Sequence, residues 1–303
     1  MTSPNPSPSA MDRVGGAPVS WGVNEVPDWG HQLNPHTVLS EMSALGLTAT
    51  EAGPDSFLPA DSQQAADMLA GHGLKLIAGF VPVALHQVWD THRAETLATR
   101  ATWLRDVGAS VVVLAAATGL DGYETRPDLD FDGWKRLLAN LQQASTICTD
   151  LGMLLTIHPH VGTMVQRPTE IEYVLRGTDL KLCLDTGHIL AGGGDPKQIA
   201  ENHPDRIGHV HFKDVKAPVA EAVRTDQLSY AAAVRQGLYA CLGDGDVDIA
   251  GIMRLLENNG YTGRYVVEQD LQLTSAGAGH IPRQNMQRNL AYLRGVTATL
   301  ASL

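Results

Sequence analysis

Two histidines stand at the end of an apolar stretch of the sequence. The run 153–159 includes His158, and His160 follows it with Pro159 between the two. Residues two apart on a strand project from the same face, so we expect both imidazoles to point into one space. Imidazoles that share a space are typical of a metal centre or of a polar binding pocket.

Three further apolar runs end in ionisable residues. These residues are Asp185 and His188, then His209, His211 and Lys213, then Glu268 and Asp270. A set of carboxylates and imidazoles suits Mn²⁺, Co²⁺, Fe²⁺ or Zn²⁺, whereas Mg²⁺ prefers more oxygen ligands. Each residue alone has an ordinary structural role, such as a hydrogen-bonded core histidine or a helix cap. Their coincidence on four runs predicts a functional site.

The elements that must position these residues alternate along the chain. Strands are predicted at 17–22, 48–53, 74–82, 109–117, 153–159, 180–188, 207–214 and 264–270, and helices at 35–45, 62–72, 92–107, 132–151 and 250–259. Eight strands alternating with helices indicate an α/β protein with a parallel sheet, closed as a (β/α)8 TIM barrel. An open doubly wound sheet is the rival, but the segment after the first run lacks a GxGxxG turn. In a barrel the predicted site lies at the carboxyl ends of the strands.

Composition limits the classes of function. The chain has 303 residues, 22 of them basic and 33 acidic, for a net charge of −11, which argues against nucleic acid as a partner. Three widely spaced cysteines predict no disulfide framework. The longest apolar run, 111–117, is too short to cross a membrane. We expect a cytoplasmic protein with a disordered tail at 1–16 and a single barrel domain at 17–303, and homo-oligomer formation stays open.

Three motifs carry a resemblance to a known family. CLDTGH at 183–188, HVHFKD at 209–214 and VVEQD at 266–270 resemble the xylose isomerase-like barrels of sugar isomerases and epimerases. Within that superfamily, APVSWGVNE at 17–25, HPHVGTMVQ at 158–166 and LGDGDVDI at 242–249 are similar to the inosose dehydratases of myo-inositol catabolism. The resemblance covers roughly residues 17–293.

The resemblance implies a metal-dependent enzyme with a small polyol or keto-sugar substrate. The family's metal ligands fall on His158, Asp185, His211 and Glu268, with Mn²⁺ or Co²⁺ as the expected ion and Zn²⁺, Fe²⁺ or Mg²⁺ as alternatives. Isomerases and epimerases of the superfamily usually have glutamate where this chain has His158. In two-base epimerases that glutamate exchanges a proton with the strand-eight glutamate, so its replacement argues against the symmetrical mechanism.

The expected reaction is dehydration of an inosose or a similar cyclic keto-polyol through an enediolate. The resemblance implies Glu268 as the base, with His160, His188 or Lys213 as the acid. Expected substrate contacts are Glu51, Trp21, His86 and His188, and the loops 118–127 and 217–239 are expected to set substrate choice.

Three other functions stay open at this point. A sugar isomerase or epimerase would share the metal and the proton abstraction without expelling water. A metal-dependent DNA-repair endonuclease should show a basic surface, which the net charge of −11 opposes. A non-catalytic sugar-binding or regulatory barrel would bind inosose without converting it.

Overall fold

The computed structural model of the chain describes residues 9–300. Eight parallel strands form a closed barrel in the order β1-β10-β7-β6-β5-β4-β3-β2. Their bounds are β1 Val14–Gly16, β2 Ala49–Glu51, β3 Lys75–Val83, β4 Val111–Ala116, β5 Leu154–Ile157, β6 Lys181–Asp185, β7 Ile207–Phe212 and β10 Tyr265–Val267. The predicted TIM barrel is therefore confirmed.

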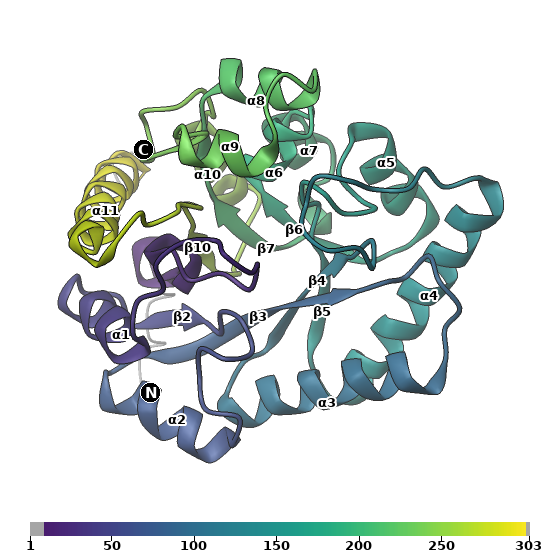
Figure 1. Ribbon diagram of the computed structural model, residues 1–303, viewed down its shortest axis with the longest axis horizontal. Helices are drawn as coiled ribbons and strands as arrows, with labels where there is room; N and C mark the ends of the chain where they lie inside the picture. The colour runs from purple at the N-terminus through teal and green to yellow at the C-terminus, as the bar shows by residue number, and fades with distance from the viewer. Residues whose placement is uncertain (1–8, 301–303) are drawn as a thin grey trace, which may run out of the picture.

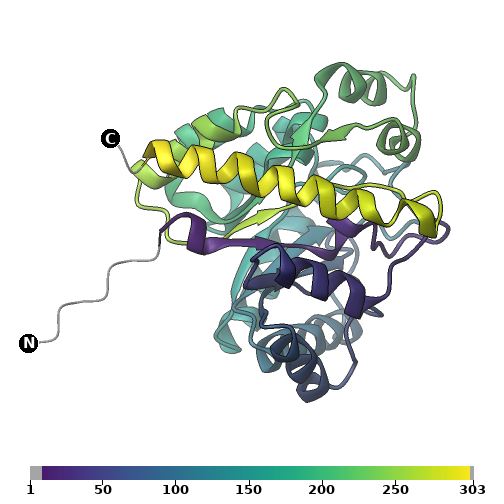
Figure 2. The ribbon, with the colours of Figure 1, turned by 90° about the vertical axis from the view of Figure 1, so that its left-hand side faces the viewer.

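Helices surround the strands (Figure 1). They are α1 Pro35–Ala44, α2 Ser62–Gly71, α3 Thr91–Val107, α4 Phe131–Asp150, α5 Pro168–Gly177, α6 Thr186–Ala191, α7 Pro196–Asn202, α8 Ala217–Arg224, α9 Tyr230–Arg235, α10 Ile249–Asn258 and α11 His280–Leu300. The five predicted helices are confirmed to within a residue or two. Figure 2 shows α11 lying along the outside of the barrel near β1.

Polar side chains determine where the helices start. The carboxylates of Asp61, Asp90 and Asp130 accept hydrogen bonds from backbone amides in the first turns of α2, α3 and α4. Such caps satisfy amides that have no partner within the helix. At the other end, the predicted glycine stop after α4 has a φ of 73° at Gly152, a left-handed conformation that glycine adopts without a steric penalty.

The first strand differs from the prediction. The strand is Val14–Gly16 rather than 17–22, and Pro18–Trp21 forms a 3-10 helix. Proline has no amide hydrogen for a strand ladder and suits the first turn of a helix instead. The barrel thus begins within the expected tail 1–16, because Val14 pairs with Tyr265 of β10. Residues 1–8 of that tail lie outside the described part of the chain.

Apolar side chains fill the space between the barrel and the helices, and smaller groups fill its interior. One interior cluster contains Ala78, Val111, Val113 and Cys183. The three cysteines, Cys148, Cys183 and Cys241, are buried and free, as the sequence predicts. A short antiparallel pair, β8 Asp214–Val215 and β9 Tyr239–Ala240, follows β7 outside the barrel. Among residues 9–300, no helix combines the length and apolar character needed to cross a bilayer.

Candidate active site

A cavity of about 450 Å³ lies where the barrel strands end. Its lining brings together most of the residues predicted for the site, namely Glu51, His158, His160, His188, His211, Lys213 and Glu268. Asp185 is fully buried beside them, with its Oδ2 atom 3.2 Å from Nε2 of His158. The structure thus brings these residues together, because the carboxyl ends of parallel strands share one edge of the barrel.

Strand pairing brings the predicted metal ligands close together at the carboxyl ends of β6, β7 and β10. Asp185 of β6 is paired with His211 of β7, and His211 is paired with Val266 of β10, two residues before Glu268. Alternation along β10 then turns Glu268 to the same side as Val266. His158 follows the last residue of β5, and its amide extends the ladder by donating to the carbonyl of Leu114.

Buried charges in the site are mostly negative. Glu51, Asp185, Glu268 and Asp270 are buried carboxylates, and the Lys213 ammonium lies among three of them. Its Nζ atom is 3.4 Å from Asp185, 3.0 Å from Glu268 and 2.8 Å from Asp270. Burial alone would lower the pKa of Lys213, but these carboxylates raise it well above the usual value, so the amine stays charged.

The Glu51 carboxylate is held by two histidines. One oxygen, Oε1, lies 2.7 Å from Nε2 of His209 and 2.9 Å from Nε2 of His211. An ionised carboxylate only accepts hydrogen bonds, so both Nε2 atoms carry hydrogen and donate. Burial opposes ionisation, but the two histidines hold the pKa of Glu51 below its usual range. His211 therefore presents its other nitrogen, Nδ1, to Asp185 and Glu268.

The arrangement around this nitrogen suits a cation. Nδ1 of His211 lies 3.4 Å from Asp185 and 3.3 Å from Glu268, yet among residues 9–300 it has no hydrogen-bond partner. Asp185, His211 and Glu268 each offer one ligand atom, and these atoms lie within 4.8 Å of one another. Burial disfavours the charged form of His211, but the neighbouring carboxylates raise its pKa well above the usual value, so the ring holds a positive charge here that a metal ion would replace. The predicted donor set thus fits a divalent metal ion.

Charge also controls two further carboxylates that line the cavity, Glu268 and Asp270. Burial opposes ionisation of Glu268, but His211 and Lys213 hold its pKa at about 2. Burial instead raises the pKa of Asp270 to about 6, although Lys213 acts in the opposite direction. Glu268 is therefore ionised at neutral pH, and Asp270 titrates closer to neutrality.

His160 and His188 are neutral. Burial, with the nearby His158 and Lys213, lowers the pKa of His160 to about 3. Burial and the adjacent His160 lower the pKa of His188 in the same way. The two rings pack with their centroids 3.7 Å apart, and Nε2 of His188 lies 3.1 Å from Nζ of Lys213. Because the ammonium only donates, Nε2 of His188 is the acceptor.

Two loops that were expected to set substrate choice meet beside the cavity. Tyr123, in the loop 118–127, lines the cavity, and its hydroxyl donates to Glu25. The next residue, Glu124, accepts hydrogen bonds from the backbone amides of Tyr230 and Ala231 in the segment 217–239. These contacts join the loops after β1, β4 and β7.

Two of the predicted substrate contacts are wrong. Trp21 is fully buried away from the cavity lining, and its indole nitrogen donates to Glu41. The 3-10 helix that replaces the expected strand turns this ring into the core. His86 is half-buried and does not line the cavity either. Its loop is held by Arg136 and Asn140 of α4, which donate to the carbonyls of His86 and Leu85.

Sequence analysis assigned no role to three contributors to the site. Asp270 and Tyr123 line the cavity, and His209 supports Glu51 beneath it. Alternation along β7 and the two-residue step from Glu268 to Asp270 were signals that placed His209 and Asp270 nearby. No local signal marked Tyr123, because its position depends on the fold of a long loop.

Known proteins with the same architecture match this chain. Residues 39–295 match the model of the xylose isomerase-like TIM barrel family. The chain belongs to that family. An inosose dehydratase of Geobacillus kaustophilus (strain HTA426) is 34% identical over 273 residues, which cover 85% of this chain and 87% of that protein.

Two further similarities extend the comparison. The rhizopine catabolism protein MocC of Rhizobium meliloti is 32% identical over 288 residues, covering 90% of this chain and 87% of that protein. Among solved structures, that of an L-ribulose 3-epimerase superposes with a TM-score of 0.69 at 16% identity and covers 96% of each chain. At that identity the structural likeness supports the fold alone.

Proposed function

We propose that this protein is a metal-dependent dehydratase that removes water from an inosose or a similar cyclic keto-polyol, in inositol catabolism. The observation that carries the proposal is the pairing of Glu268 with the Lys213 ammonium, 3.0 Å away, at the edge of the cavity. The site thereby offers one ionised proton acceptor beside one proton donor. On β5, where a two-base epimerase needs a second carboxylate, this chain has the imidazole of His158. The inosose dehydratase relative supports the same substrate class.

The ligand set assigned to the metal is His158, Asp185, His211 and Glu268. A divalent cation in this set, with Mn²⁺ or Co²⁺ favoured by its mixed donors, would polarise the ketone and make the neighbouring C–H more acidic. Glu51 lies behind His211 and fixes its ring through the hydrogen bond to Nε2. We therefore assign Glu51 a positioning role rather than the substrate contact expected from the sequence.

The proton transfers can be completed within the site. Glu268 takes the proton from the carbon next to the carbonyl, and Lys213 gives a proton to the departing β-hydroxyl, which leaves as water. A carbon–carbon double bond forms, and the resulting enol tautomerises to the diketone. Because Nζ of Lys213 lies 3.0 Å from Oε2 of Glu268, the abstracted proton can return to the amine. Positioned proton transfers of this kind typically contribute ~10²–10⁴ in rate.

The neutral imidazoles of His160 and His188 line the same cavity and are proposed to hydrogen-bond the substrate's hydroxyl groups. Nδ1 of His160 donates to the backbone carbonyl of Val161, which leaves Nε2 of that ring as an acceptor for a substrate hydroxyl group. His188 is linked to Lys213, so a substrate bound there would also be aligned with the proton donor.

Proton NMR of the Mn²⁺-loaded protein, with scyllo-inosose in D₂O, tests the proposal; the paramagnetic protein is removed before each spectrum. We expect the dehydrated diketone to accumulate with time, and Glu268→Gln to abolish this while the fold persists by circular dichroism. Deuterium incorporation or a new stereoisomer without loss of water would instead establish an epimerase. Binding of inosose with no conversion would indicate a non-catalytic barrel.

A further inference from the structure

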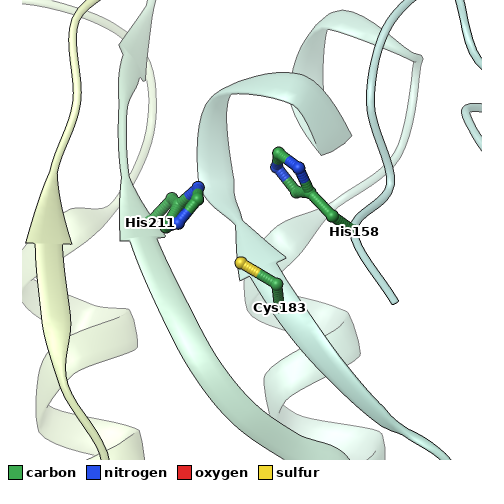
Figure 3. Close-up of side chains that lie close together, drawn as sticks. All are labelled: His158, Cys183 and His211. Atoms are coloured by element: carbon green, nitrogen blue, oxygen red, sulfur yellow. The ribbon is translucent and has the colours of Figure 1, made fainter. Parts of the chain in front are cut away.

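Cys183 lies inside the barrel, directly below the predicted metal ligands. It precedes Asp185 by two residues on β6, so its side chain shares the inward face one step deeper. Figure 3 shows the side chains of His158, Cys183 and His211 converging on one space. Each of the three offers one ligand atom, and these atoms lie within 4.8 Å of one another. This group differs from the group of Asp185, His211 and Glu268, although both contain His211.

A second observation points to a ligand at this position. Nδ1 of His158 and Nδ1 of His211 are both buried, and neither has a hydrogen-bond partner among residues 9–300. The two side chains are only 3% and 2% exposed. Buried imidazole nitrogens normally have a partner, because an unpaired buried polar group is costly. Each of the two histidines thus has a buried nitrogen without a hydrogen-bond partner, in a group whose third member is a sulfur atom.

Donor chemistry separates the two overlapping groups. Thiolate and imidazole together favour thiophilic ions such as Zn²⁺ and Cd²⁺, whereas carboxylate-rich groups favour Mn²⁺ or Mg²⁺. We propose that His158, Cys183 and His211 form a second, deeper binding position for a thiophilic divalent cation. Binding there transfers the thiol proton to solvent and forms a metal–sulfur bond, with no change of oxidation state.

The deeper position shares two histidines with the proposed catalytic ligand set. His158 and His211 belong to the proposed catalytic ligand set as well, so one ion cannot use both positions and two ions compete for the same imidazoles. On the other side, Cys183 packs with Ala78, Val111 and Val113, an apolar wall that excludes water from the sulfur. Thiophilic ions therefore displace Mn²⁺ from the site. This last step rests on the proposed function, whereas binding by the three residues does not.

The test uses metal spectroscopy on the full chain. Cd²⁺ or Co²⁺ added to the metal-free protein should produce a sulfur-to-metal charge-transfer absorption band, and X-ray absorption of the Zn²⁺-loaded protein should show a sulfur neighbour at about 2.3 Å. Cys183→Ala should remove both signals and weaken Zn²⁺ binding by at least roughly 10–100-fold. Cys148→Ala is the matched control, since Cys148 is also a free, fully buried thiol but lies in α4.

The wild-type measurement decides the question even if a variant fails to fold. A Zn²⁺ shell without sulfur in the wild-type protein would overturn the proposal, as would a sulfur signal that survives Cys183→Ala. Displacement of Mn²⁺ by Zn²⁺, followed by electron paramagnetic resonance, tests the competition separately. A charge-transfer band in a protein that does not dehydrate inosose would refute the proposed function and leave this site standing.

Discussion

Replacing Lys213 with methionine removes the buried ammonium while keeping most of its side-chain length. In the wild-type protein Nζ lies within 3.4 Å of Asp185, 3.0 Å of Glu268 and 2.8 Å of Asp270. Without it these carboxylates share a water-poor space with no lysine charge between them. Removing one partner of a buried ion pair typically costs ~3–5 kcal/mol. We therefore expect the variant's free energy of unfolding to fall by about that amount.

The expected loss is large enough to measure by thermal unfolding. For a chain of 303 residues one kcal/mol shifts Tm by roughly 1.5–2 °C, so Lys213→Met should lower Tm by about 5–10 °C in metal-free buffer. Added Mn²⁺ should recover part of this loss, because a divalent cation supplies positive charge to the same carboxylates. Turnover of inosose should fall by ~10²–10⁴, because the proposed proton donor is gone.

Lys197→Met is the matched control. Its Nζ atom lies 2.7 Å from Asp248, but both side chains are about half exposed, at 42% and 52%. Solvent screens an exposed pair, which therefore contributes little to stability, so this variant should leave Tm nearly unchanged. If the Tm of Lys213→Met differs from that of the wild type by as little as the Tm of Lys197→Met does, the reasoning about buried charge in the site is refuted.

Three other substitutions test separate features of the site. Glu51→Gln should weaken Mn²⁺ binding by ~10–100-fold in calorimetry, because the amide oxygen can still accept from His211 but lacks the negative charge that holds the ring; unchanged affinity would contradict this positioning role. A Cβ at Gly187 would lie 2.6 Å from Cγ of Lys213, so Gly187→Ala should displace the ammonium and reduce turnover by about 10²-fold at unchanged circular dichroism. Asp214→Ala should cost about 3 kcal/mol in denaturant unfolding, because three backbone amides at 243–247 lose their acceptor, and a loss below about 1 kcal/mol would show that water replaces it.

The placement of the site could be predicted from the sequence because it follows from chain direction alone. Once eight parallel strands are inferred, His158, Asp185, His211 and Glu268 must meet, since each stands at the end of a neighbouring strand. Alternation then selects which side chains point inward, and Lys213 follows His211 by two residues on that face. None of this requires knowledge of how the helices pack.

Sequence reasoning fell short where a residue's role depends on contacts distant in sequence. Glu51 lines the cavity, but the sequence could not show that its carboxylate is bound by His209 and His211, about 160 positions away in the chain. Trp21 stands near the site in sequence and still faces the core, because Pro18 starts a 3-10 helix there. The first strand was misplaced because its residues, Val14–Gly16, carry only one apolar side chain for a periodicity argument to detect.

The charge balance of the cavity links metal binding to the stability of the barrel. Four buried carboxylates face one another across a space that holds the Lys213 ammonium. Proton binding offsets part of this excess: burial disfavours a charged His211, but Cys183 and the surrounding carboxylates raise its pKa well above the usual value. A divalent ion would take over that role with two charges, and a ligand that binds only the folded state stabilises it in proportion to the logarithm of its concentration. The acidic cluster that lines the proposed site is thus also the part of the fold that would be stabilised most by a bound cation.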